Sequence, residues 1–245
     1  MRRCISEHHA RIAAVIMECF HGRAAAMAEE AAYARAVYDL CRAHNILFIA
    51  DEVRQGAGKT GRFLSYEHLG ADVRPDLVTM GKSITGGFYP ASFVLGTAEV
   101  MDLVGTGESA STFAANPLAV AAAQAAIAVI DDEGLVERAT AIGKRWVEAV
   151  ESWKHPLVRY VTNRGADSMV VLQGVRSQRV AALALLKGLL VFPRDDYLRI
   201  SPAMVISDEE IDRAAQIMKE TLDEVNEYDE IPGEFWDVTT KTSQV

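Results

Sequence analysis

An aspartate and a lysine each follow an apolar run of this sequence. Asp51 comes directly after Ile46–Ala50, and Lys82 lies just past Asp76–Met80. In open α/β sheets, ligands bind at the carboxyl ends of the strands. This pair suits pyridoxal phosphate, because a lysine forms a Schiff base with it while an aspartate keeps its pyridine nitrogen protonated. The freed lysine amine can then move a proton. Spacing alone leaves the ordinary alternative open, a strand-end aspartate and a surface lysine with no shared ligand.

Two Gly-Lys-Ser/Thr triplets, Gly58–Thr60 and Gly81–Ser83, raise the alternative of a nucleotide-phosphate loop. Such a loop needs a glycine six residues before its lysine, so that backbone amides can surround the phosphates. Val53 and Asp76 occupy those two positions. The sequence therefore argues against a nucleotide hydrolase.

The elements around the two residues alternate between strand and helix. Ala13–Met17 and Ile46–Ala50 are short continuous apolar runs, typical of strands buried on both faces, and Glu29–His44 between them has helical spacing. This order predicts two parallel strands joined by a right-handed crossover. Asp76–Met80 and Ala91–Leu95 predict a third and a fourth strand.

The second half of the chain predicts a mixture of helices and strands. An alanine-rich helix begins after Asn116-Pro117 and runs to about Ile130, and an amphipathic helix from Leu135 to Trp153 continues it. The capping-box pattern from Ser207 to Glu210 starts a closing helix. Between them we expect strands at 158–161, 169–172, 189–192 and 198–200 and a helix at 177–187. The polar end of the chain, 228–245, lacks periodicity and predicts a mobile tail.

Composition excludes several classes of protein. The 245 residues, half of them hydrophobic and 24% charged, suit a soluble globular chain. A net charge of -9 argues against nucleic-acid and membrane partners, and no apolar run reaches the length of a membrane span. Cys4, Cys19 and Cys41 have no metal-ligand spacing and cannot all pair, so we expect reduced core thiols and no metal site. A cytoplasmic location is expected, with a mitochondrial one left open.

Several collinear motifs carry a family resemblance. They are Leu47–Val53, Gly58–Arg62, Arg74–Asp76, Gly81–Ser83, Gly86–Pro90, Ser111–Phe113, Asn116–Leu118, Arg164-Gly165 and Leu198–Pro202. Over roughly residues 12 to 226, the chain resembles the class III pyridoxal-phosphate-dependent aminotransferases, most closely the ornithine aminotransferase branch. The resemblance implies an α/β protein of aminotransferase fold type I.

The resemblance also implies how the chain divides. Residues 1–135 correspond to the remainder of the cofactor-binding large domain with a mainly parallel sheet, 136–227 to a C-terminal α+β small domain, and 228–245 to a polar tail. The family carries a long N-terminal portion before this stretch, which supplies a phosphate-binding loop and an aromatic that stacks on the cofactor ring. We therefore expect two-thirds or less of the usual chain, weaker cofactor binding and an exposed sheet edge.

Three matched positions are implied to bind the cofactor at the strand ends. Lys82 resembles the Schiff-base lysine, and Asp51 the partner of the pyridine nitrogen. Val53 matches the residue that packs on one face of the ring, although a core valine at a strand end would look the same.

Further matched positions imply contacts with the phosphate and the substrate. Thr112, with Ser111 beside it, matches the threonine that reaches the cofactor phosphate of a neighbouring subunit, which implies a homodimer. Arg199 matches the arginine that binds the substrate α-carboxylate, for which a planar bidentate donor is well shaped. The plain alternatives are a helix-capping hydroxyl and a surface arginine.

Several positions near the implied site depart from the family pattern. Arg54 stands where the family usually has a glutamine that donates to the phenolic oxygen of the cofactor, and it could still donate there. Arg23 replaces a glutamate that pairs with the carboxylate-binding arginine, so it would repel Arg199 instead. Ala114-Ala115 replaces a glycine pair, which adds two methyl groups where the backbone makes close contacts.

The sequence therefore predicts a transaminase that moves an amino group from an ornithine-like ω-amino donor to a 2-oxo acid. Two alternatives stay open. One is a truncated or degenerate, catalytically inactive relative, and the other is a fold-related racemase or aminomutase with the same lysine and aspartate. The expected partners are amino-acid and 2-oxo-acid substrates and a second copy of the chain.

Overall fold

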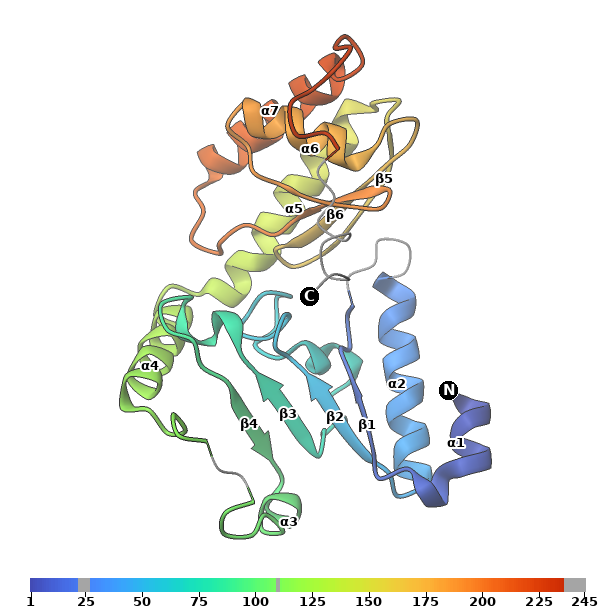
Figure 1. The fold of residues 1–245 in the computed structure, drawn as a ribbon, viewed down its shortest axis with the longest axis vertical. Helices are drawn as coiled ribbons and strands as arrows, with labels where there is room; N and C mark the ends of the chain where they lie inside the picture. The colour runs from blue at the N-terminus through green and yellow to red at the C-terminus, as the bar shows by residue number, and fades with distance from the viewer. Residues whose placement is uncertain (22–26, 109–110, 236–245) are drawn as a thin grey trace. The chain divides into compact units, whose positions relative to one another are not determined.

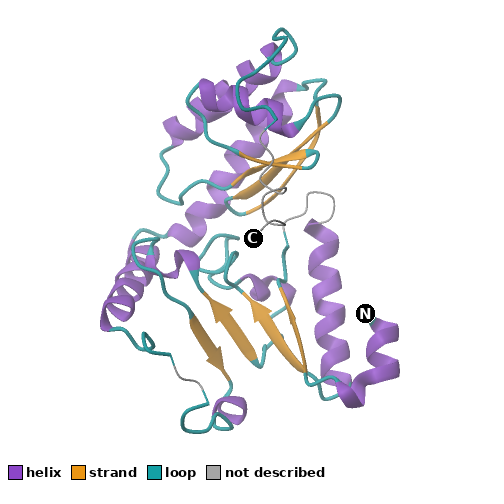
Figure 2. Ribbon diagram, viewed as in Figure 1, coloured by secondary structure: helices purple, strands orange, loops and turns teal. Residues whose placement is uncertain are grey.

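A computed structural model describes residues 1–21, 27–108 and 111–235 (Figure 1). These residues form two units, one that runs up to Glu137 and one that starts at Arg138. Each unit combines helices with its own four-stranded sheet, which confirms the predicted α/β class (Figure 2).

The sheet of the first unit has the strand order β1-β2-β3-β4. The strands are β1 (Ala14–Met17), β2 (Leu47–Asp51), β3 (Leu77–Met80) and β4 (Phe93–Gly96). The first three run parallel and β4 runs antiparallel to β3. All four predicted strands are therefore confirmed, and the carboxyl ends of β1, β2 and β3 lie at one edge of the sheet (Figure 1).

The helix α2 (Met27–Ala43) makes the crossover between β1 and β2 and covers one face of the sheet. Its buried side recurs at helical spacing, with Ala34, Val37, Tyr38 and Cys41 turned inward, as the sequence predicts. Tyr38 packs edge-on against Phe48 of β2, with ring centroids 5.4 Å apart. Two short helices, α1 (Arg2–His8) and the 3-10 helix η1 (His9–Arg11), precede β1.

The helical stretch after β4 is interrupted. A short helix α3 (Ala98–Met101) is followed by α4 (Pro117–Asp132) and α5 (Leu135–Trp153). The predicted bounds of both helices agree with the structure, but the second does not continue the first, because Gly134 adopts a φ of +59° and separates them.

The second unit has an antiparallel sheet in the order β5-β6-β8-β7. Its elements are β5 (Val158–Arg164), β6 (Asp167–Leu172), α6 (Ser177–Leu186), β7 (Phe192–Arg194), β8 (Tyr197–Ile200) and α7 (Asp208–Glu224). Side chains of β6, β8, α5, α6 and α7 form one apolar core. The capping box at Ser207 and Glu210 is confirmed.

One strand of this unit starts later than the sequence predicts. The expected strand at 189–192 is realised only from Phe192, as part of β7. The backbone N–H of Leu189 instead donates to the carbonyl of Ala184 at 2.8 Å, and Gly188 has a φ of +90°. These two features end α6 and leave residues 189–191 outside the sheet.

The described part of the C-terminal tail packs on the second unit, which differs from the predicted mobility. Ile231 and Glu234 are buried, and Arg179 of α6 binds both the carboxylate of Glu234 and the backbone carbonyl of Tyr228. A buried charge held by an arginine fixes a segment that has no hydrophobic periodicity.

The three cysteines are free, but they differ in exposure. Cys19 and Cys41 are buried as predicted, whereas Cys4 is exposed, which corrects its assignment to the core. Cys4 lies on α1, where only Ile5 is buried. In the part of the chain that the structure describes, no helix is both long enough and apolar enough to cross a membrane.

Candidate functional site

Asp51 ends β2 with its carboxylate held in a defined orientation. Its Oδ1 accepts hydrogen bonds from the backbone N–H of Val53 at 3.1 Å and from Oγ1 of Thr79 at 3.2 Å. Thr79 is its register partner on the neighbouring strand β3. Among the described residues, Oδ2 accepts no hydrogen bond, so one carboxylate oxygen is fixed by the protein and the other is available to a ligand.

Lys82 lies beyond the end of β3 in an unusual backbone conformation. It opens the 3-10 helix η3 (Lys82–Thr85), follows an extended Gly81, and has a φ of +48°. The left-handed region costs a residue with a Cβ roughly 1–2 kcal/mol, and such strain concentrates at functional sites. The side chain is exposed, and within the described ranges it forms no ion pair.

Glu52 anchors the loop that begins at Asp51. Its carboxylate is buried and accepts hydrogen bonds from the backbone N–H and Oγ of Ser65 and the backbone N–H of Tyr66, each at 2.8 Å. Burial raises the pKa of this carboxyl above its ordinary value, although the three donors oppose that change. Glu52 thus holds the 3-10 helix η2 (Ser65–Leu69) against the end of β2.

Arg54 connects the loops that follow β1 and β2. Its Nε donates to Oε2 of Glu18 at 3.0 Å, and its Nη2 donates to the carbonyl of Phe20, also at 3.0 Å. Nε2 of Gln55 donates to the same carbonyl at 3.3 Å. Arg23, the other charged departure noted in the sequence, lies outside the described residues.

Ser111 and Thr112 lie in an exposed turn before α4. Asn116, rather than Thr112, caps this helix through its side chain, and Nδ2 of Asn116 donates to the hydroxyl of Tyr89 at 3.0 Å. The turn therefore sits next to the segment that follows Lys82. No hydrogen bond in the described ranges joins Ser111 or Thr112 to Asp51 or Lys82.

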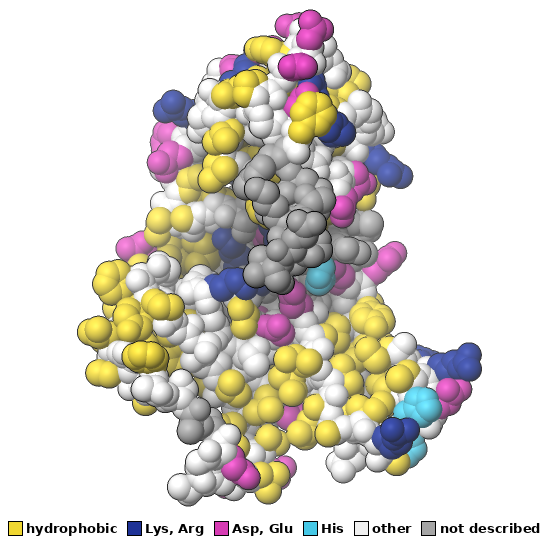
Figure 3. All heavy atoms as spheres, in the orientation of Figure 1, with side chains coloured by type: hydrophobic (Ala, Val, Ile, Leu, Met, Phe, Trp, Pro, Cys, Tyr) yellow, Lys and Arg dark blue, Asp and Glu magenta, His cyan; other side chains and the backbone are white. Residues whose placement is uncertain are grey.

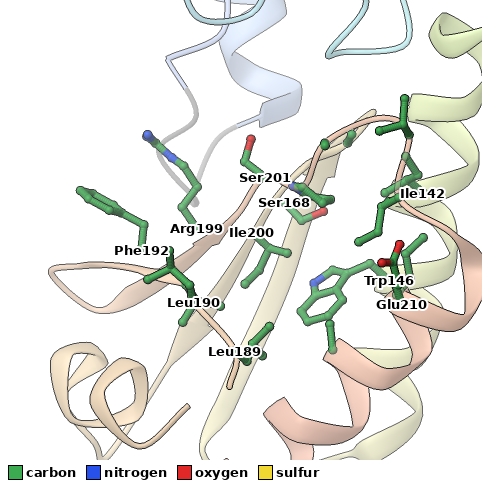
Figure 4. A pocket seen from close by; sticks show the side chains of 18 residues that line it. Ile142, Trp146, Ser168, Leu189, Leu190, Phe192, Arg199, Ile200, Ser201 and Glu210 are labelled. Atoms are coloured by element: carbon green, nitrogen blue, oxygen red, sulfur yellow. The ribbon is translucent and has the colours of Figure 1, made fainter. Parts of the chain in front are cut away.

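Arg199 belongs to the second unit, whereas the other candidate residues belong to the first. It pairs across the sheet with Met169 of β6 and Phe192 of β7. Its Nε is buried and has no hydrogen-bond partner among the described residues. Figure 4 shows its side chain on the same side of the sheet as Phe192. The terminal nitrogens of a guanidinium are planar bidentate donors, which suit a carboxylate ligand.

The first unit thus brings Asp51, Val53, Arg54 and Lys82 to one sheet edge. Val53 is half-buried, and an atom added at Cα of Gly81 would lie 3.5 Å from its Cγ1, so the two strand ends are in close contact. An oriented carboxylate and an exposed primary amine on adjacent strand ends are two of the groups that pyridoxal phosphate needs, the partner of its ring nitrogen and the Schiff-base lysine. The residues present therefore fit this cofactor.

Sequence reasoning missed Thr79 and Glu18. The positions of both residues depend on which strands are neighbours. Thr79 of β3 is the register partner of Asp51 of β2, and Glu18 follows β1, which pairs with β2. A carboxylate directly after each of two neighbouring parallel strands was the available signal for Glu18.

Comparison with known proteins agrees with this geometry. The model of the family described as aminotransferase class III matches residues 1–222. The ornithine aminotransferase of Schizosaccharomyces pombe is 36% identical over 228 residues, which are 91% of this chain and 52% of that protein. The chain spans about half the length of the curated relatives that it matches.

Solved structures give the same result. An ornithine aminotransferase from Toxoplasma gondii, described as having partial occupancy of pyridoxal phosphate at its active site, has a TM-score of 0.83 at 31% identity. The match covers 93% of this chain and 55% of that one. An S-selective transaminase from an Arthrobacter species has a TM-score of 0.85 at 27% identity, covering 92% of this chain and 54% of that one.

Proposed function

We propose, because this chain belongs to the class III aminotransferase family, that it is a pyridoxal-phosphate-dependent transaminase. It would move an amino group from an ornithine-like ω-amino donor to a 2-oxo acid. The relatives named ornithine aminotransferase, at 34–36% identity, support this choice of donor.

The observation that carries the proposal is the orientation of Asp51. Two donors hold Oδ1, and Oδ2 has no partner among the described residues. In this state, Oδ2 can accept a hydrogen bond from a protonated ring nitrogen. The two donors to Oδ1 keep the carboxylate from rotating. Lys82 lies past the end of the adjacent strand, as a covalent attachment point requires.

Each residue then has a part in the reaction. Pyridoxal phosphate, when bound, supplies an electron sink for the substrate carbon that loses its proton. Asp51 would keep the proton on the ring nitrogen, and the Nζ of Lys82 would accept and return the substrate proton. Val53 would pack on one face of the ring, and Arg54 would donate toward its phenolic oxygen.

Substrate and phosphate binding complete the proposal. Arg199 would bind the substrate carboxylate through its guanidinium. Ser111 and Thr112 would reach the cofactor phosphate of a second copy, so the active form would be a homodimer. The free thiols suit a reducing compartment such as the cytoplasm.

Covalent loading of the chain tests the proposal. We expect the purified chain with added pyridoxal phosphate to develop a visible absorbance band, and borohydride reduction to fix the label on the peptide that contains Lys82. Lys82→Ala should abolish both signals. Lys59→Ala is the matched control, because Lys59 stands in the other Gly-Lys triplet and should leave both signals intact.

A chain that folds but stays colourless would favour the catalytically inactive relative. A band that survives in Lys82→Ala would overturn the assignment of this lysine. Screening amino donors with the coloured protein then separates ornithine-like donors from others, and separates amino transfer from racemisation.

A further inference from the structure

One face of the sheet in the first unit is closed by packing. The strands β2 and β3 turn alternate residues to it, and these are all buried: Phe48, Ala50, Val78 and Met80. The helix α2 covers this face, since its Tyr38 packs edge-on against Phe48. Successive residues of a strand point to opposite faces, so the side chains between these positions form a second face.

The second face, which we call the open face, is apolar and accessible. The strand register places its residues in three rows: Ala14 with Leu47, then Ile16 with Ile49, Leu77 and Gly96, then Asp51 with Thr79 and Val94. None of these residues is buried, and Ile16 and Val94 are 59% and 54% exposed. Figure 3 shows hydrophobic side chains gathered where Figure 1 draws these strands. Asp51, at the carboxyl end of β2, is the one charged residue in the three rows.

The composition of the open face indicates that something covers it. A sheet with one face in water alternates apolar and polar residues, whereas parallel strands are covered by helices on both faces and are apolar throughout. The parallel strands β1, β2 and β3 follow the second pattern, because their only polar residues are Thr79 and the terminal Asp51. The missing cover is therefore expected to be helical.

The two outer strands of this sheet are open as well. In the part of the chain that the structure describes, β1 and β4 end the strand order, so each has one edge without a hydrogen-bonded neighbour. Edge strands are commonly protected by charged residues or proline, but β1 and β4 contain neither. The sheet can thus accept a strand at each edge in addition to helices on its open face.

An α/β polypeptide with both helices and strands to donate fits these openings. The chain spans 52% of the Schizosaccharomyces pombe relative and 50% of the Emericella nidulans relative, and the family carries a long N-terminal portion before the stretch that this chain resembles. A second copy of the chain fits less well, because its open face would place a sheet, and not helices, on the parallel strands.

We propose that the open face and the edges of β1 and β4 bind the N-terminal half of a class III aminotransferase, and that the two halves associate even as separate polypeptides. The helices of that half would lie across the rows of Ile16 and Val94, and its strands would pair with the two edges. This inference rests on the family and on the packing of the sheet, and it does not require transaminase activity.

Co-expression with a defined probe tests the partner. The probe is the N-terminal portion of the Schizosaccharomyces pombe ornithine aminotransferase that precedes the matched stretch. We expect an affinity-tagged copy of this chain to capture the probe in a one-to-one ratio. Hydrogen–deuterium exchange in the peptides that contain β1 and β4 should be slower in the complex than in the chain alone, because their outer edges become paired.

Two lysine substitutions test the open face. Ile16→Lys and Val94→Lys change exposed positions, so each variant should fold as the unaltered chain does, which thermal melting checks. Each should lower the amount of captured probe about tenfold or more, because the association would bury a charge without a partner. Leu186→Lys is the matched control, because Leu186 is a 61% exposed aliphatic residue of α6 in the second unit. Its capture of the probe should stay within about twofold of that of the unaltered chain.

Three results would overturn the proposal. One is no capture of the probe by the unaltered chain, and another is equal capture by the Ile16→Lys, Val94→Lys and Leu186→Lys variants. The third is a homo-oligomer of the chain that Ile16→Lys and Val94→Lys dissociate, which would assign the open face to a second copy. No cofactor is added in these experiments, so this proposal can fail while the proposed transaminase function stands, and a colourless complex would count against the transaminase alone.

Discussion

At the scale of single residues, the orientation of Asp51 depends on one hydroxyl from the neighbouring strand. Thr79 donates to Oδ1, and the second donor is the backbone N–H of Val53, which only a substitution by proline would remove. The side chain of Thr79 is thus the part of this arrangement that mutation can test.

We predict that Thr79→Val weakens pyridoxal phosphate binding about three- to tenfold, because it removes one hydrogen bond to a charged group at a partly exposed site. Valine keeps the β-branched shape that suits a strand. Titration of the visible band with cofactor gives the affinity. Thr79→Ser keeps the hydroxyl, so its affinity for pyridoxal phosphate should stay within about twofold of that of the unaltered chain. Equal affinities of the Thr79→Val and Thr79→Ser variants would contradict the prediction.

Residue types and apolar runs were enough to predict that Asp51 and Lys82 lie at the ends of neighbouring strands, because a polar residue after an apolar run is visible in one segment. The pairing of Arg54 with Glu18 was not predictable in this way, since it joins residues 36 positions apart. It depends on which strands are neighbours. The left-handed backbone of Lys82 was also hidden, because a lysine gives no local signal for positive φ.

At the scale of elements, one glycine lets α5 approach the β5–β6 hairpin closely. A Cβ added at Gly143 would overlap the carbonyl oxygen of Gly165 and Nδ2 of Asn163. The Asn163 side chain already donates to that carbonyl at 2.8 Å, so neither atom can move aside without a loss.

We predict that Gly143→Ala lowers the free energy of unfolding by about 2–3 kcal/mol, because overpacking outweighs the gain of about 1 kcal/mol in helix propensity. Urea denaturation measures the change. Lys144→Ala, at the next and exposed position of α5, should change stability by less than about 0.5 kcal/mol. A stabilised Gly143→Ala variant would show that the helix does not contact the hairpin this closely.

Periodicity predicted most helices and strands, since buried faces recur every two residues in strands and at three to four in helices. It failed at residues 189–191, where an apolar run lines a cavity instead of joining the sheet. It also failed at 228–235, where the contact between Arg179 and the buried carboxylate of Glu234, instead of an apolar face, holds the segment in place. In both places the stabilising contact comes from outside the segment.

At the scale of the whole chain, the first unit exposes a set of large apolar side chains around the start of α4. Phe88, Phe113 and Leu118 are 84%, 81% and 63% exposed. Figure 3 shows hydrophobic side chains gathered over α4. The hydrogen bond between Asn116 and Tyr89 places the segments that carry these residues side by side.

Exposed apolar patches of this kind mark association surfaces. We predict that the chain self-associates through this one, and that Phe88→Ser combined with Phe113→Ser shifts the equilibrium toward monomer by about tenfold or more in dissociation constant. Sedimentation velocity over a concentration series measures it. Leu186→Ser, at an exposed apolar position of α6, should leave the association unchanged. A monomeric unaltered chain at all concentrations would contradict both this prediction and the proposed homodimer.

The uneven exposure of the three cysteines gives the chain a built-in set of chemical handles. Cys4 is accessible to a maleimide dye or a nitroxide label without any engineered thiol, whereas Cys19 and Cys41 are shielded. Burial also raises the pKa of the Cys19 thiol, which keeps it in the unreactive protonated form. One thiol should therefore label within the mixing time, and the slow labelling of the other two would report how often the first unit opens.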